Sequence, residues 1–453
     1  MNLNRQIQPL LFKKKFHLNY KHLMLLIAMI LFSIPSITNT TLPIPGFKSD
    51  INSYQIIILL TFISLFFNEK ISYKSFTVKK LSIIFGFIII FNIFRMNFGI
   101  PDEDIYLMRG IFNCSFNLMI TFIVSSFFNN WLTVKSFSNI TLIYGIIISI
   151  SAIFEFILLR VSMPMLEKWR IFVWGNLDSE MLFRAGGVIL NSDGLARVGG
   201  LIGAPENLGY ILSLTIPIFI LADTPSIIRI LTLSIYTISS LVSGSRGLPI
   251  VIIFYSILLF TSKSKYYSKD KILFLIIFAI LISTSIYYGL NSDALSRFSN
   301  EAFIYEWNWR IKRLVSAISI MDQNWFYPIL GIGLGWGIEE KFELWSFTSG
   351  LLGGDFVVAY CLGGFIGIGI LITFWKIVIK YKILISSFGE KARISINLFI
   401  LFTFGLSLIM PVFTQLFLGS AMFPSLMIAN LLIWERLIRE KRLKSFCVNK
   451  FEI

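Results

Sequence analysis

Histidine, cysteine and charged residues are all scarce in this chain. Among 453 residues there are two histidines and three cysteines, and only 14% of the residues are charged. Both histidines, His17 and His22, lie near the N-terminus. A site elsewhere in the chain therefore cannot depend on a histidine-ligated zinc ion, a histidine general base or a Ser-His-Asp triad. The sequence also lacks a G-x-x-x-x-G-K-[ST] motif, which argues against an ATP-driven machine.

Apolar residues dominate instead. Hydrophobic residues make up 56% of the chain, aromatic residues 16%, and the mean hydropathy is +0.77. A water-soluble domain could not bury so much apolar surface. Because a helix needs about 20 apolar residues to cross a bilayer core, we predict an all-α polytopic membrane protein with about twelve transmembrane helices. The predicted spans are 22–38, 51–67, 81–98, 106–128, 138–159, 206–222, 227–243, 247–262, 272–289, 351–375, 394–412 and 419–435.

Lysine and arginine are distributed differently about these spans. If the N-terminus is cytoplasmic, 20 of the 24 lysines fall on the inner side, but only six of the 16 arginines do. The lysine pattern follows the positive-inside rule and predicts that both termini are cytoplasmic. The net charge of +15 is then explained by topology and not by nucleic-acid binding. The outer arginines need another reason, because a guanidinium matches phosphates and carboxylates in a way that lysine does not.

Two long connections divide the chain. On this topology, 160–204 and 290–350 are external loops, and long loops in a compact protein commonly carry function. The organisation is therefore nine helices within 1–289, the large external loop 290–350, and three helices with a basic cytoplasmic tail within 351–453.

The second loop contains the stretch SNEAFIYEWNWRIKRLVSAISIMDQNW, in which apolar residues recur at helical spacing. Glu306, Arg310 and Arg313 fall on another face of the predicted helix. Two interpretations stay open: an amphipathic helix on the membrane surface, or a lid over an anionic substrate.

Arginines within or beside apolar runs are informative, because an ionised side chain there is costly unless it is paired or hydrated. Arg95, Arg109, Arg197 and Arg246 are of this kind. Arg95 and Arg109 flank the segment FGIPDEDIY, whose acidic triplet at 102–104 could neutralise them in a structural cluster. The same triplet is similar to the D-x-D metal motif of some glycosyltransferases, which is a further alternative.

Four motifs occur in order along the second half of the chain. RVGGLIGAPENLG at 197–209 and LVSGSRGLP at 241–249 are separated by two apolar spans. Arg310 then precedes an aromatic and glycine-rich stretch at 325–335, and GGDFVVAYCLGGFIG follows at 353–367. Over roughly 190–370 the chain resembles the O-antigen polymerase and ligase superfamily. Ligases of that family carry a histidine in the last motif.

This chain has Gly353 where those ligases have the histidine, whereas Asp355 keeps the acidic position. The chain is therefore most similar to the Wzy-type polymerases. The resemblance implies a GT-C-like fold in the bacterial inner membrane, with lipid-linked oligosaccharide as substrate, no cofactor and a chain-length regulator protein as a partner.

The resemblance further implies the reaction. The growing glycan is transferred from undecaprenyl pyrophosphate to a sugar hydroxyl of the next lipid-linked unit at the outer face of the membrane. Arginines can stabilise the leaving pyrophosphate without a metal ion, and a carboxylate can accept the proton of the hydroxyl. The small residues around one of these arginines would let the backbone approach a phosphate closely. The residues expected to bind pyrophosphate are Arg197, Arg246, Arg310 and Arg313, and those expected to act as base are Glu206 and Asp355.

Other classes stay open. A ligase, a flippase or another transporter for lipid-linked saccharides would have a similar composition, and so would a structural assembly protein. For Arg246, a role as an anchor to lipid phosphate at a helix end is the alternative to substrate binding.

Overall fold

The computed structural model describes residues 20–38, 41–42, 51–67, 75–98, 104–175, 198–203, 205–222, 224–243, 252, 255, 300–334, 354–385, 387–407, 416 and 422–450. These residues are almost entirely helical. The exception is a pair of two-residue strands, β1 (Thr41–Leu42) and β2 (Ile51–Asn52), which pair antiparallel.

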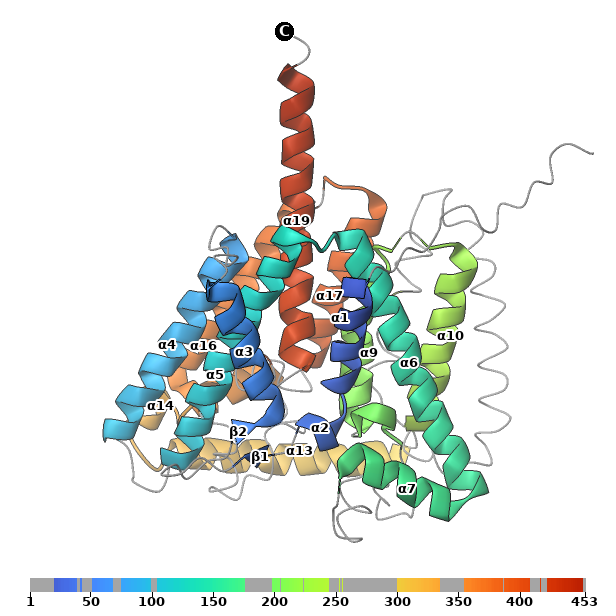
Figure 1. Ribbon diagram of the computed structural model, residues 1–453. Helices are drawn as coiled ribbons and strands as arrows, with labels where there is room; N and C mark the ends of the chain where they lie inside the picture. Colours follow the sequence, from blue (N-terminus) through green and yellow to red (C-terminus); the bar gives the residue numbers. More distant parts are fainter. Residues whose placement is uncertain are drawn as a thin grey trace, which may run out of the picture.

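The helices follow the order of the sequence and are labelled as in Figure 1. They are α1 (Tyr20–Leu31), α2 (Pro35–Thr38), α3 (Ser53–Phe67), α4 (Phe76–Phe98), α5 (Asp104–Asn130), α6 (Val134–Val161), α7 (Met163–Trp174), the 3-10 turn η2 (Gly200–Ile202), α9 (Pro205–Phe219), α10 (Ser226–Ser243), α13 (Asn300–Met321), α14 (Tyr327–Leu330), α16 (Gly354–Ile385), α17 (Glu390–Ser407) and α19 (Met422–Lys450).

The predicted all-α membrane architecture is confirmed by the length and hydropathy of these helices, which indicate a multi-pass membrane protein. Four helices within the described residues are long and apolar enough to cross a membrane, and each coincides with a predicted span. Shorter apolar helices lie at further predicted spans. The long ones are Phe76–Asn97, Asp104–Asn130, Val134–Val161 and Asp355–Ile385, and the shorter ones are Tyr20–Leu31, Ser53–Phe67, Asn207–Phe219 and Ile227–Ser243.

The remaining predicted spans are described in part or not at all. The spans 247–262 and 272–289 lie outside the described residues, except for Ile252 and Tyr255. The spans 394–412 and 419–435 are described only in part, by α17 and α19. The total of twelve therefore stays a prediction.

The helices pack side by side, with α13 across one end of the bundle and the C-terminal end of α19 projecting beyond the other (Figure 1). Helix α4 packs on α5, α6 packs on α9 and α10, and α16 packs on α14 and α17. Helix α19 packs against both α5 and α9. The end that carries α13 also carries α7 and α14 (Figure 1).

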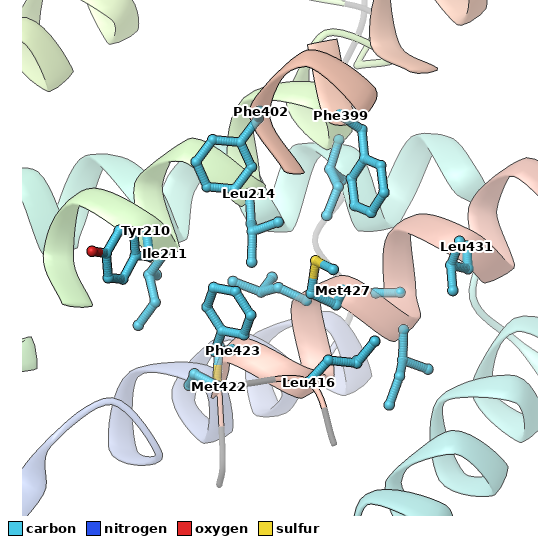
Figure 2. Packing of buried hydrophobic residues seen from close by; sticks show 14 of the residues in the cluster. Tyr210, Ile211, Leu214, Phe399, Phe402, Leu416, Met422, Phe423, Met427 and Leu431 are labelled. Atoms are coloured by element: carbon cyan, nitrogen blue, oxygen red, sulfur yellow. The ribbon is translucent and has the colours of Figure 1, made fainter. Parts of the chain in front are cut away.

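The centre of the bundle is apolar. Side chains of α9, α17 and α19 meet there, including Leu214, Phe402 and Met427 (Figure 2). The rings of Phe399 and Trp434 pack edge to face with centroids 4.6 Å apart, and both side chains are buried. This contact joins α17 to α19 in the core.

The connection predicted as an external loop from 160 to 204 is partly helical. Helix α6 continues to Val161, and α7 follows after the single residue Ser162, whose backbone is extended. Pro164 lies in the first turn of α7, a position that suits proline because its missing N–H would be unpaired there in any case. The chain thus reverses onto the end of α6 and does not leave it as an open loop.

Candidate functional site

The first part of the site is the segment that follows Arg197. Glu155, on α6, is 2% exposed, and its Oε2 accepts hydrogen bonds from the backbone N–H groups of Gly199 at 3.2 Å and Gly200 at 2.7 Å. Its Oε1 accepts from Nε of Arg170, on α7, at 3.2 Å. One carboxylate therefore holds α6, α7 and the segment that begins at Val198 together.

Gly200 permits this close approach. Its φ is +58°, and a Cβ at this position would lie 2.4 Å from Oγ of Ser151 and 2.6 Å from the backbone nitrogen of Ala152. Ser151 Oγ accepts a hydrogen bond from the N–H of Leu201 at 2.9 Å. A residue with a side chain would have to move this segment away from α6. The motif glycine is explained by contact between two backbones.

Arg170 is buried and charged. Burial lowers the pKa of its guanidinium below the usual range, and the carboxylate of Glu155 opposes that shift. Because a guanidinium titrates far above neutral pH, Arg170 stays protonated and donates a charge-assisted hydrogen bond to Glu155. Glu155 and Arg170 were both missed as site residues by sequence reasoning.

The second part of the site is a break in α16. Gly364, in the middle of this helix, has φ +57° and ψ −145°, which no helical residue adopts. The break leaves carbonyl groups without helical partners. Those of Cys361 and Leu362 accept hydrogen bonds from the N–H groups of Ile332 at 2.8 Å and Gly333 at 2.9 Å. The glycine-rich stretch that follows α14 thus docks into the broken helix.

The docking depends on two glycines, each of which lies against the backbone of the other segment. A Cβ on Gly331, where φ is +69°, would lie 2.3 Å from the carbonyl oxygen of Leu362. A Cβ on Gly364 would lie 2.3 Å from the carbonyl oxygen of Ile329. The described parts of these two motifs, 325–334 and 354–367, are separate in the sequence but form one unit, which we call the interlocked unit.

Of the carboxylates predicted as base, Asp355 is in the first turn of α16, before the break, and is 1% exposed. Glu206 is in the first turn of α9, directly after Pro205, and its side-chain contacts lie outside the description. The structure therefore places Asp355 in the interlocked unit and does not test whether Glu206 joins it.

The predicted arginines are less completely described. Arg310 and Arg313 lie on α13, which contacts α16, but their side-chain contacts are outside the description. Arg197 and Arg246 lie outside the described residues. Arg197 immediately precedes the anchored segment that begins at Val198.

The helix predicted in the second long loop is confirmed as α13. Its apolar side chains recur on one exposed face and include Ile304, Ile311, Val315 and Ile318. Such a face is typical of a helix that lies in the membrane interface. This favours the membrane-surface interpretation, and a function as a lid stays a prediction.

A metal site would require a cluster of ligating side chains. Among them, no three His, Cys, Asp or Glu side chains lie together in a way that could hold a metal ion. Asp102 and Glu103, which belong to the acidic triplet, lie outside the description, and Asp104 begins α5.

Comparison of the chain with protein-family models gives no match, and neither do comparisons with curated proteins and with solved structures.

Proposed function

We propose that this chain is a Wzy-type polymerase, a GT-C-like membrane glycosyltransferase that joins lipid-linked oligosaccharide repeat units. The donor is the growing glycan on undecaprenyl pyrophosphate, and the acceptor is a sugar hydroxyl of the next lipid-linked unit. The reaction takes place at the outer face of the bacterial inner membrane and needs no metal ion.

One observation supports this proposal above the others. The glycine-rich stretch 331–334 docks into the break of α16, at the end of the bundle where α13 lies (Figure 1). A broken helix presents backbone groups and a half-helix N-terminus at membrane depth, and irregular backbone is tolerated there only when protein or an aqueous cavity surrounds it. Asp355 lies on the half-helix that leads to this break.

The mechanism follows from the chemistry of the leaving group. The acceptor hydroxyl oxygen attacks the anomeric carbon of the donor sugar, and the bond between that carbon and the pyrophosphate oxygen breaks. Charge grows on the pyrophosphate as it leaves, and guanidinium groups stabilise it. The proton of the hydroxyl passes to a carboxylate. The arginines are Arg197, Arg246, Arg310 and Arg313, and the carboxylates that can accept the proton are Glu206 and Asp355.

The topology belongs to the same proposal. Lys380 lies over the ring of Phe76, at the start of α4, and Lys441 of α19 donates to the carbonyl oxygen of Ser387. These lysines lie at the end of the bundle away from α13. The positive-inside rule places that end, and both termini, in the cytoplasm. Labelling of a Ser346→Cys variant by a membrane-impermeant thiol reagent in whole spheroplasts tests this. Labelling that requires opened membranes would reverse the orientation.

Reconstitution tests the activity. The purified chain is placed in liposomes with lipid-linked repeat units, and glycan length and leaflet distribution are measured. Longer glycan indicates a polymerase, whereas movement between leaflets without lengthening indicates a flippase. Transfer to added lipid A-core instead indicates a ligase. Chelation with EDTA leaves elongation nearly unchanged if arginines alone hold the pyrophosphate. Loss that magnesium or manganese restores would point to the triplet at 102–104 as a metal site.

A further inference from the structure

Arg95 is a buried cation at the end of a membrane-spanning helix. It lies in the last turn of α4 and is 6% exposed. Helix α4 is one of the helices long and apolar enough to cross a membrane, and its last turn points toward α14 and the end of the bundle that carries α13 (Figure 1). A charge buried at this depth requires a partner of opposite charge or a polar ligand.

No carboxylate supplies that partner within the part of the chain that the structure describes. None of the ion pairs formed there includes Arg95, and its Nε, although buried, has no hydrogen-bond acceptor. Asp104, the next described acid along the chain, has a buried Oδ1 that also lacks a partner. Arg95 and Asp104 therefore do not form an ion pair, and Asp102 and Glu103, the other acids of the expected cluster, lie outside the described residues.

The surroundings of Arg95 come from the interlocked unit. Its guanidinium carbon lies 5.7 Å from the ring centroid of Tyr327, which is 4% exposed. Asn92, one turn earlier on α4, is fully buried and donates from Nδ2 to the carbonyl oxygen of Leu334 at 2.8 Å. Arg95 thus lies where α4 meets the stretch that docks into the break of α16.

Arginines near other span ends have different surroundings. Arg229, in the first turn of α10, is also buried, but it donates from Nη1 to the carbonyl oxygen of Thr224 at 2.8 Å. Arg109 lies over the ring of Tyr106 and Arg160 over the ring of Phe156, each on its own helix, and both arginines are exposed. Arg95 differs from Arg109 and Arg160 because it is buried and because its aromatic neighbour comes from a distant segment.

We propose that Arg95 binds a lipid-borne phosphate group at the outer ends of α4 and α16, with Tyr327 covering one side. A guanidinium is a planar donor that matches two oxygens of a phosphate, and such bonds are strongest away from water. Phosphate is the anion present at this depth, because the last turn of a spanning helix lies at the level of the lipid headgroups. Membrane phospholipid and polyprenyl pyrophosphate both carry this chemistry.

If the lipid is the polyprenyl donor, the inference rests on the proposed function. Arg95 then adds a fifth arginine to the four named in the sequence analysis, and it comes from the half of the chain that the family resemblance does not cover. Its role is to hold the donor headgroup beside the stretch that docks into the break of α16.

The test measures thermal unfolding and ligand affinity of the full chain in nanodiscs of zwitterionic lipid. The probes are undecaprenyl pyrophosphate, undecaprenol without phosphate, and phosphatidylglycerol. The variants are Arg95→Met and Arg95→Lys, with Arg160→Met as the matched control because Arg160 also lies over a ring at a helix end. The wild-type protein is expected to be stabilised by a phosphate-bearing lipid and not by undecaprenol.

For Arg95→Met, we expect the ligand-free protein to unfold at the same or a higher temperature, since an uncompensated buried charge has been removed. Its affinity for the phosphate-bearing lipid should fall by about tenfold to a hundredfold. Arg95→Lys should also bind about tenfold more weakly, since a flexible ammonium group does not reproduce the paired donors of a planar guanidinium. The Arg160→Met variant should bind as the wild type does.

If Arg95 only stabilises the fold and binds no lipid, the results for its variants are reversed, and the proposal is overturned. Arg95→Met would then unfold at a lower temperature while its affinity for lipid stays unchanged. If the methionine variant does not fold, unchanged affinity in Arg95→Lys overturns it as well. Equal stabilisation by phosphatidylglycerol supports the phosphate site and assigns it to membrane phospholipid. If the wild type elongates no glycan but the Arg95-dependent stabilisation persists, the polymerase proposal fails and the phosphate site stands.

Discussion

Arg170 donates a hydrogen bond from its Nε to Oε1 of Glu155 over 3.2 Å, and both side chains are almost completely buried. The other oxygen of Glu155 accepts from the backbone of Gly199 and Gly200. The pair therefore does more than neutralise two charges. It fixes the segment that begins at Val198, which directly follows the predicted site residue Arg197 in the sequence.

Replacement of Glu155 by leucine should be strongly destabilising. It leaves Arg170 as a buried charge without its partner and removes the acceptor for two backbone N–H groups. Breaking one side of a buried pair typically costs about 3 to 5 kcal/mol. In the double variant Glu155→Leu/Arg170→Met, the loss should be clearly smaller than the sum of the two single losses. Denaturant unfolding of the purified wild type, the two single variants and the double variant measures the free energies of this double-mutant cycle.

Glu167 provides the control for that cycle. It lies on α7 beside Arg170 in sequence but is exposed, so Glu167→Gln should change the free energy of unfolding by no more than about 0.5 kcal/mol. Additive losses for Glu155 and Arg170 would show that the pair is not a unit in the membrane-embedded protein.

Alanine at Gly364 should disrupt the break in α16. Its combination of φ +57° and ψ −145° costs an L-residue about 1 to 3 kcal/mol, and a Cβ would overlap the carbonyl oxygen of Ile329. The stretch that docks there should be displaced, and elongation per folded molecule should fall by at least about tenfold, as expected when a misplaced site loses its geometry.

Gly369, five residues later on the same helix, is the matched control because nothing lies within 4 Å of a Cβ there. Gly369→Ala should retain elongation and raise helix stability by up to about 1 kcal/mol. If Gly364→Ala elongates glycan as the wild type does, the break is not part of the catalytic arrangement.

Glu435 should matter for stability and not for activity. This side chain of α19 accepts from Ser75 Oγ at 2.6 Å and from the N–H groups of Phe76 and Thr77, and so caps α4. Glu435→Ala should cost about 2 to 3 kcal/mol through the lost cap and the unsatisfied donors. Elongation per folded molecule should stay unchanged, because this cap lies at the end of the bundle away from α13.

The comparison for Glu435→Ala is Glu440→Ala, which removes a partly exposed carboxylate paired with Arg436 on the same helix. Such surface pairs contribute about 0 to 1 kcal/mol. Unfolding and elongation are measured on the same preparations. A loss of elongation per folded Glu435→Ala molecule would show that the two ends of the bundle are coupled.

Much of the fold could be predicted because membrane spans and amphipathic helices follow local periodicity. The apolar windows located the long helices, and the spacing of Phe303, Trp307, Ile311 and Leu314 located α13. Helix α7 was not predicted, because its short apolar face packs on α6 only after the chain reverses at Ser162.

The site was predicted less completely, and the reasons differ between residues. Glu155 had a signal, since it is an acid inside an apolar run, and the argument applied to the buried arginines applies equally to it. The pairing of Glu155 with Arg170 has no signal in the sequence, because the pair forms only through the tight reversal between α6 and α7. The break of α16 was also not predictable, since the flanking glycines allow a break but the docked stretch stabilises it.

Arg246 is the residue for which substrate binding and lipid anchoring make opposite predictions. If its guanidinium binds the pyrophosphate through two donors, lysine cannot replace it. Arg246→Lys should then lose about a hundred- to a thousandfold in turnover, equivalent to about 2.7 to 4 kcal/mol, because the contact strengthens as the bond to the pyrophosphate breaks. An anchoring residue would tolerate lysine, and Arg246→Ala would lower the amount of folded protein more than its activity per molecule. Elongation per folded protein for both variants, with Lys13→Ala as the cytoplasmic control, separates these cases. Near-normal elongation by Arg246→Lys would make this arginine an anchor and leave Arg197, Arg310 and Arg313 to hold the leaving group.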